Sequence, residues 1–227
     1  MKNPSRFHKE RALRKAGYPV PPFPVAPVDD GVDGVDAATR LKADREFLDA
    51  CAAWEDAIDT RYLALIRSLP PIEPSPDVRD FIQRCEQYGL TAGLTGLNGR
   101  VPHRYTAVYQ LDHETLRNIE LVDKVGEARP DYLAAVPLGT SFCQFVLRDG
   151  AFLTSDSGHD HRLDGHPYQG VMVSYHGVPV LDTEGELYGS LCHFDVSEQP
   201  LSAAEFEHLQ GVASAIAPYL KSQGTRA

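Results

Sequence analysis

The chain has 227 residues, 42% of them hydrophobic, which is enough to bury a core in one generous domain with extensions. Its formal net charge is −10, and apart from a basic N-terminus the chain should repel nucleic acid. No apolar run approaches the roughly 18 residues of a membrane helix. We therefore expect a cytoplasmic protein that binds neither nucleic acid nor a membrane.

The first 36 residues combine a basic arm with a proline-rich linker. Residues 1–15 hold six basic residues and one acid, and residues 18–36 hold five prolines and two Asp-Gly pairs. This composition favours extended, solvated chain. We expect residues 1–36 to be mobile and assign them no function.

Residues 37–96 are predicted to hold N-terminal amphipathic helices. Apolar side chains recur at spacings of three and four from Phe47 to Leu69, as on one face of a long helix. A second helix is expected to begin at Pro76, with Ser75 as its N-cap. Closely spaced glycines then predict a turn: Gly93, Gly96 and Gly99.

From residue 97 the apolar period changes to two, and residues 97–224 are predicted to form the main domain. Gly185 suits the positive φ of a hairpin turn. A short helix after Ser141 and a last helix capped by Ser202 accompany the strands. Strands are predicted over residues 105–111, 116–122, 151–154, 171–180 and 186–195.

This order of elements predicts an antiparallel sheet between N-terminal and C-terminal helices. The helices would cover one face of the sheet and leave the other face to the irregular middle segment. We expect a pocket between the sheet and that segment.

Four stretches in order resemble the GAF superfamily: Val136-Pro-Leu-Gly-Thr-Ser-Phe-Cys143, Asp156, Ser174-Tyr-His-Gly-Val-Pro-Val180 and Leu187-Tyr-Gly-Ser-Leu-Cys-His-Phe-Asp195. The resemblance implies an α/β (α+β) fold with a GAF/PAS-like central antiparallel sheet of five to six strands. It further implies a small-molecule pocket under the middle loops and dimerisation through terminal helices. It does not identify a ligand.

Strand alternation and family position together nominate ligand-binding residues. Alternation places Tyr188, Ser190, Cys192 and Phe194 on one face of the last strand. Free backbone amides near Phe142 and Cys143 would favour a small polar or anionic ligand. The alternative is that Cys192 and Phe194 only pack in a core. The candidates are Tyr109, Phe142, Cys143, Asp156, Tyr168, Tyr175, Ser190 and Cys192.

No catalytic or metal-binding residue is assigned. The loop over residues 155–170 contains His159, His161 and His166 beside aspartates, but without the fixed spacing of a metal motif. Cys192 and His193 lie on a predicted strand, whereas bilin-binding GAF domains place their Cys-His pair on a helix, and no cyclic-nucleotide motif is present. The cofactor therefore stays unknown, with neither a covalent bilin nor a cyclic nucleotide expected.

The sequence predicts a sensor module that passes ligand binding to a partner protein, such as a separate sensor kinase or another regulatory protein. We expect a homodimer formed through the N-terminal helices together with the C-terminal helix. One alternative is a thiol-dependent enzyme of the free methionine sulfoxide reductase type that uses Cys143 or Cys192. That subfamily has a reactive cysteine in a loop where this chain has Gly165-His-Pro-Tyr168. Another alternative is a ligand-free structural module.

Overall fold

The computed structural model describes residues 4–26, 37–68 and 73–220. Its contacts divide the chain into two compact units, Met1–Pro71 and Ile72–Ala227. The sequence predicted a boundary near residue 97 instead. The difference arises because the helices that follow residue 72 pack on the sheet.

The first unit contains helix α1 (Pro4–Lys15) and helix α2 (Ala37–Ser68). The basic arm, expected to be mobile, thus forms a helix that packs on α2. Leu13 is fully buried, and Lys9 places its ammonium 2.9 Å from the Asp59 carboxylate. Burial of Leu13 gives this short basic helix a packing partner in α2, which the composition does not reveal. The core residues of this unit are Leu13, Trp54, Ile58, Tyr62 and Leu65.

The start of the proline-rich linker also contacts α2. Trp54 Nε1 donates a hydrogen bond to the Pro21 carbonyl at 3.0 Å, and Phe23 packs edge-on against the Trp54 ring with centroids 5.2 Å apart. Residues 18–26 therefore lie along the helix as a strap. The remainder of the predicted linker, residues 27–36, and the predicted helix end at Leu69 lie outside the described residues.

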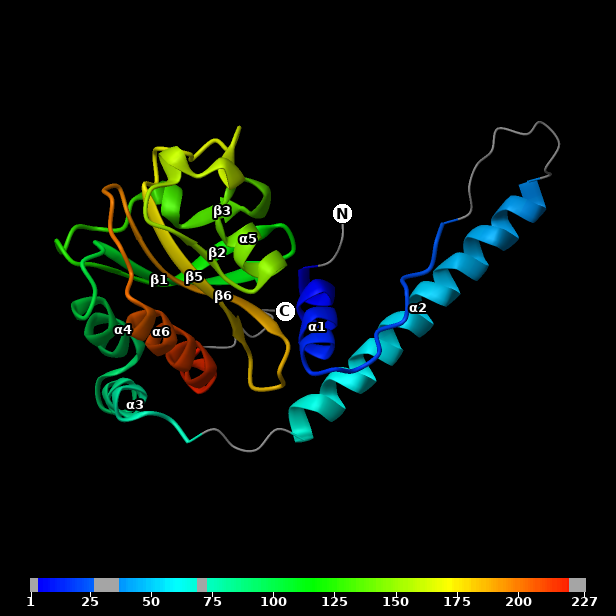
Figure 1. The fold of residues 1–227 in the computed structure, drawn as a ribbon, viewed down its shortest axis with the longest axis horizontal. Coiled ribbons are helices and arrows are strands. Elements are labelled where there is room, and N and C mark those ends of the chain that lie inside the picture. Colours follow the sequence, from blue (N-terminus) through cyan, green and yellow to red (C-terminus); the bar gives the residue numbers. More distant parts are fainter. Residues whose placement is uncertain (1–3, 27–36, 69–72, 221–227) are drawn as a thin grey trace, which may run out of the picture. The chain divides into compact units, whose positions relative to one another are not determined.

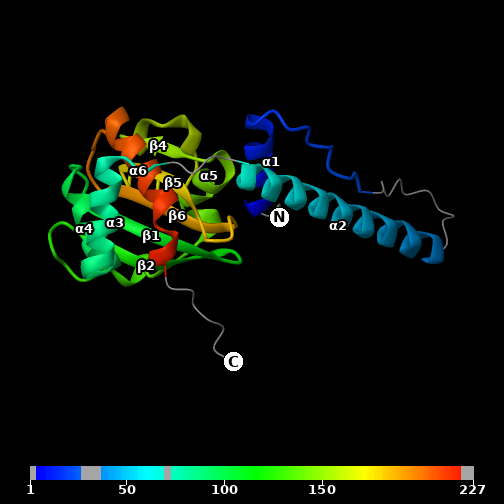
Figure 2. The same cartoon turned by 90° about the horizontal axis from the view of Figure 1, so that it is seen from below.

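The second unit is built on a six-stranded antiparallel sheet with the strand order β3-β2-β1-β6-β5-β4 (Figures 1 and 2). The hairpin predicted at Gly185 is present, and this glycine has the positive φ of 85° that its turn requires. The short β3 was not predicted. The strands are β1 (Tyr105–Asp112), β2 (Thr115–Asp123), β3 (Ala135–Pro137), β4 (Phe152–Thr154), β5 (Ser174–Leu181) and β6 (Leu187–Asp195).

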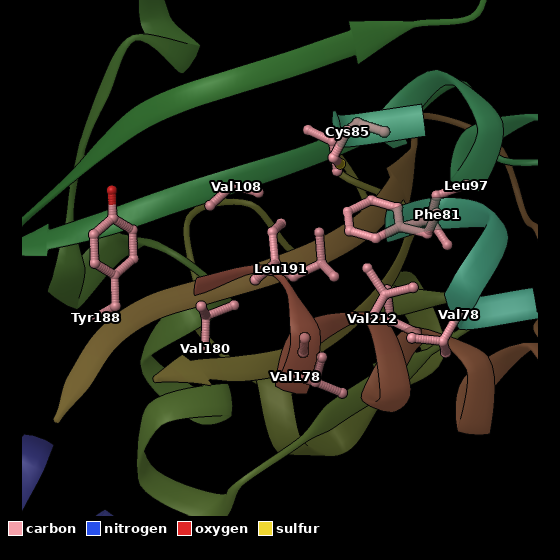
Figure 3. Packing of buried hydrophobic residues seen from close by; sticks show 14 residues of the cluster. Val78, Phe81, Cys85, Leu97, Val108, Val178, Val180, Tyr188, Leu191 and Val212 are labelled. Atoms are coloured by element: carbon pink, nitrogen blue, oxygen red, sulfur yellow. The ribbon is translucent and has the colours of Figure 1, made fainter. Parts of the chain in front are cut away.

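Helices α3 (Pro76–Tyr88), α4 (Leu90–Gly99) and α6 (Ala203–Ala215) pack on one side of this sheet, called here the helix face (Figures 1 and 2). Ser75 and Ser202 cap α3 and α6 as predicted. Figure 3 shows the core beneath them, where side chains of α3, α4 and α6 meet those of the strands. The labelled members are Val78, Phe81, Cys85, Leu97, Val108, Val178, Val180, Tyr188, Leu191 and Val212.

The predicted glycine-rich turn is wrong, because Gly93, Gly96 and Gly99 all lie in α4. A Cβ at Gly93 would come within 2.3 Å of Cys85 Sγ. The missing side chain therefore lets α4 approach α3 closely, and this packing outweighs the low helix propensity of glycine.

The opposite side of the sheet, called here the cavity face, is covered by the short helix α5 (Cys143–Asp149) and irregular connections. Tyr188 does not lie on this face, contrary to the simple alternation of its strand. The pairing passes from Val180 with Gly189 to Leu181 with Leu187, which leaves Tyr188 without a partner. This β-bulge turns its side chain into the helix-face core.

Candidate functional site

A cavity lies between the cavity face and the segments that cover it. Its volume, taken as the space open to the centre of a water molecule, is about 60 Å³. One water needs about 10–15 Å³ on this measure, so a molecule of several heavy atoms fits. The lining is largely aromatic and consists of Tyr109, Tyr132, Leu133, Val136, Thr140, Ser141, Phe142, Cys143, Tyr168, Met172, Tyr175, Cys192 and Phe194.

The structure brings together most of the residues nominated from the sequence. Strands β1, β5 and β6 contribute the floor, while α5, its preceding turn and the 157–172 segment contribute the walls. Ser190 is fully buried and does not line the cavity, but its hydroxyl donates a hydrogen bond to Cys143, which does. The nominated residues in the lining are Tyr109, Phe142, Cys143, Tyr168, Tyr175 and Cys192.

Asp156 does not line the cavity. Its carboxylate accepts a hydrogen bond from the Gly158 amide at 3.0 Å and pairs with His159. His161 pairs separately with Asp164. Within residues 4–26, 37–68 and 73–220, no three His, Cys, Asp or Glu side chains are arranged to hold a metal ion. Asp156 thus caps its own turn and does not stand where its nomination as a ligand-binding residue placed it.

The Cys143 sulfur makes several polar contacts in the cavity wall. It lies 3.1 Å from Tyr175 Oη, and the Ser190 hydroxyl donates a hydrogen bond to it at 3.2 Å. Cys192, from β6, donates its S–H to the Ala107 carbonyl at 3.7 Å. The residues that supply these groups, Tyr175, Ser190 and Cys192, are all buried, so their polar atoms bond to one another or to the backbone instead of to water.

These contacts give the two thiols opposite acidities. Hydrogen bonding from Cys192, helped by Ser141, Ser190 and Tyr175, lowers the pKa of Cys143 below its ordinary value, although burial opposes the shift. Burial, followed by the hydrogen bond and the charge of Cys143, raises the pKa of Cys192 well above its ordinary value. Donors aimed at a sulfur stabilise the thiolate. The pair therefore combines one acidic thiol with one that holds its proton.

The structure does not provide the free backbone amides that suggested an anion. The Cys143 amide donates to Ser141 Oγ at 3.1 Å, the Gln144 amide to the Ser141 carbonyl, and the Phe145 amide to the Phe142 carbonyl. These three amides are therefore already engaged, and α5 has only seven residues. The argument for an anionic ligand at this place is accordingly wrong.

Sequence reasoning missed about half of the lining. Phe194 could have been found, because it shares strand parity with Cys192. Tyr132 and Leu133 lie in a 3-10 turn and Val136 in a three-residue strand, which are too short for periodicity to detect. The residues that were not nominated are Tyr132, Leu133, Val136, Thr140, Ser141, Met172 and Phe194.

Comparison with known proteins yields matches in structure alone. No protein-family model matches the chain, and no curated protein matches it. The GAF domain of an Acinetobacter phosphoenolpyruvate-protein phosphotransferase aligns over 63% of this chain and 90% of its own, with 14% identity and a TM-score of 0.51. The corresponding Coxiella burnetii domain covers 63% and 89%, with 13% identity and a TM-score of 0.50. The second unit has the GAF fold.

At these identities the likeness concerns the fold alone. A type II free methionine-R-sulfoxide reductase from Thermoplasma acidophilum also aligns, over 62% of this chain and 94% of its own, with 20% identity and a TM-score of 0.47. In the part of the chain that the structure describes, no helix is long and apolar enough to cross a membrane.

The GAF-fold unit contains a second buried polar cluster, on the helix face. His103 Nε2 lies 3.0 Å from His176 Nδ1, and Thr106 Oγ1 lies 2.7 Å from His193 Nδ1. Asn98 donates a hydrogen bond to Thr106 Oγ1. Burial lowers the pKa of His103 to about 4 and that of His176 to about 3, and it lowers the pKa of His193 well below its ordinary value. All three imidazoles are therefore neutral near pH 7.

Proposed function

We propose that the GAF-fold unit is a small-molecule-binding sensor module that acts through ligand-dependent contact with a partner protein. The cavity between the sheet and its covering segments carries this proposal. GAF-fold neighbours are typically regulatory domains, and this fold places small ligands beneath such segments. The proposal assigns binding, and no catalysis, to the module.

The lining indicates the chemistry of the ligand. Most of the wall is aromatic or aliphatic, and its polar groups are a few hydroxyls and the Cys143 thiol. A pocket of this kind favours a compact, largely apolar molecule that carries one or two polar atoms. Such a ligand would bury its apolar part against Tyr109 and Phe142 and place its polar atom near Cys143.

Ligand binding would move the 157–172 segment, which supplies Tyr168 and Met172 to the cavity. Ser157 connects the two ends of this segment, because its hydroxyl donates to the Met172 carbonyl at 2.6 Å and accepts from the Gly170 amide. A ligand that holds Tyr168 and Met172 would shift the whole segment as one piece. The changed surface is the proposed contact for a sensor kinase or another regulatory protein.

A native mass spectrum of the purified protein, with a thermal-shift screen of metabolites, nucleotides and small anions, tests this proposal. A ligand at 100 times its dissociation constant adds about 2.7 kcal/mol to the free energy of unfolding. A co-purified mass or a clear shift supports a sensor. A protein that carries no ligand and responds to no compound class contradicts it and favours the ligand-free structural module.

A homodimer through the N-terminal helices is part of the same proposal. On α2, Leu41 and Leu48 are 70% and 64% exposed, and their spacing of seven residues places them on one stripe. The apolar face of α6, by contrast, is buried in its own unit at Leu209 and Val212. We therefore assign the dimer contact to α2, and a monomeric mass in light scattering contradicts it.

One observation favours a second candidate function, a thiol-dependent sulfoxide reductase. Cys143 and Cys192 both line the cavity, so a bound sulfoxide would meet two thiols. Wild-type protein would then reduce free methionine sulfoxide with a dithiol reductant, and replacement of both cysteines by serine would abolish the turnover. Absent or unchanged turnover removes this candidate.

A further inference from the structure

Two of the four cysteines meet in the cavity, although they are far apart in the sequence. All four are free thiols. Cys143 comes from α5 and Cys192 from β6, and both are almost fully buried while lining the same space. Cys85 lies instead in the helix-face core, and Cys51 lies on α2. The fold thus separates one thiol pair from two unrelated cysteines.

The hydrogen bonds make this pair asymmetric. Cys143 Sγ is contacted by the hydroxyls of Tyr175 and Ser190, which can both point protons at a sulfur that carries negative charge. The Cys192 thiol, by contrast, has one proton, which it can direct either to the Ala107 carbonyl at 3.7 Å or to the Cys143 sulfur. One sulfur is therefore arranged as a nucleophile and the other as a protonated neighbour.

The cavity limits what can reach the nucleophile. Its volume of about 60 Å³ and its aromatic walls admit a small neutral molecule and exclude bulky or strongly hydrated reagents. Hydrogen peroxide is neutral, only two heavy atoms long, and an oxidant of thiolates.

We propose that Cys143 is an oxidation site for small hydroperoxides and that Cys192 resolves the oxidised product to a disulfide. The Cys143 thiolate attacks the nearer peroxide oxygen, so that the O–O bond breaks, the sulfur becomes a sulfenic acid, and hydroxide (or an alkoxide) leaves and takes up a proton. The Cys192 sulfur then attacks the sulfenic sulfur, the S–O bond breaks, and one water is released with the Cys192 proton. Two electrons pass from the two thiols to one peroxide, and an added dithiol reverses the change.

This oxidation goes beyond ligand binding and does not depend on it. The disulfide would tie α5 to β6 across the cavity floor and remove the Cys143 contact with Tyr175. It would therefore change the same space that the proposed ligand occupies. A signal could reach the covering segment from the redox state alone.

The test treats the reduced full-length protein, in a Cys51→Ser background, with a slight excess of hydrogen peroxide. Intact mass should fall by two hydrogen atoms, digestion should yield a peptide that links Cys143 to Cys192, and dithiothreitol should restore the mass. Cys85 is the internal control, because burial and the charge of Glu86 raise its pKa to about 11. We expect Cys143 to be oxidised at least about tenfold faster than Cys85.

Single variants separate the two steps. In Cys192→Ser protein, oxidation should stop at the sulfenic acid of Cys143, which dimedone traps. In Cys143→Ser protein, Cys192 should remain a thiol. The proposal is overturned if no linked peptide forms, if Cys85 reacts as fast as Cys143, or if methionine sulfoxide but not peroxide produces the link. Because no ligand is needed, failure of the metabolite screen leaves this test unaffected.

Discussion

The ring of Tyr175 occupies the space that a side chain at position 177 would fill. A Cβ on Gly177 would lie 2.7 Å from Tyr175 Oη, and Gly177 pairs directly with Cys192 on the neighbouring strand. The missing side chain therefore lets the tyrosine lie back over its own strand. In this position its hydroxyl reaches Cys143 Sγ at 3.1 Å. One glycine thus determines the contact that polarises the cavity thiol.

Gly177→Ala should displace the Tyr175 ring and destabilise the protein by about 1–3 kcal/mol, because a methyl group has no room beneath the ring. Urea unfolding measures the loss. Gly139→Ala is the matched control, since a Cβ at Gly139 meets no atom within 4 Å and its φ is not positive. Equal stability of the two variants would contradict this account of Gly177.

Tyr175→Phe removes a single hydroxyl and should raise the pKa of Cys143, because one donor to its thiolate is lost. The ultraviolet absorbance of the thiolate, followed against pH, should shift to higher pH. The cost in stability should be about 1 kcal/mol. Tyr188→Phe serves as the control, since its hydroxyl has no hydrogen-bond partner among the described residues and lies on the helix face. A thiolate titration that does not move would refute the role of Tyr175.

Val136→Phe should block the cavity while leaving the sheet intact. Val136 is partly buried in the cavity wall, so a larger side chain extends into the open space. Any ligand-induced rise in melting temperature should fall by most of its size. Val196→Phe adds the same bulk at a position that is 51% exposed and should leave the ligand effect unchanged. If both variants keep the full ligand response, the ligand binds elsewhere.

Acid should destabilise the GAF-fold unit through its buried histidines. The pKa values of His103 and His176 lie below the ordinary value of 6.5, so the unfolded chain takes up protons first as pH falls. Stability that is complete above about pH 6.5 is therefore lost as pH decreases toward about 4, by up to about 2 kcal/mol per histidine at about pH 5.

The measurement is the free energy of unfolding in urea at several pH values. His176→Gln should flatten the acid dependence, because one titrating group is removed. His113→Asn should not, because the His113 side chain is 98% exposed on a hairpin turn whose positive φ asparagine tolerates. An unchanged slope in His176→Gln would exclude this histidine as a source of the acid sensitivity.

Leu48→Glu should dissociate the proposed homodimer, because it places a charge in the exposed apolar stripe of α2. Light scattering at micromolar concentration should then report half of the wild-type mass. Asp49→Asn, at the exposed neighbouring position, should leave the mass unchanged. A wild-type protein that is already monomeric removes the dimer from the proposal.

Local signals made most of the GAF-fold unit predictable. The helix after Ser75 and the hairpin at Gly185 each depend on residues that are adjacent in the chain, so their caps and turns could be recognised without the fold. The same reasoning gave a wrong result for the glycine-rich helix α4, which was predicted to be a turn. Its reason for being a helix, the close approach of Gly93 to Cys85, lies in another element.

The candidate site divides in the same way. Strand alternation, together with the family position of each strand, nominated Tyr109, Tyr175 and Cys192 for the pocket, because side chains within a strand alternate with a period of two. The bulge at Tyr188 broke that rule where two strands change register. The residues that face these strands across the cavity come from α5 and the turns, and their positions depend on how those segments pack over the sheet. Cys143 and Tyr175 are 32 residues apart in the sequence, and they lie close together because both are buried in the same core.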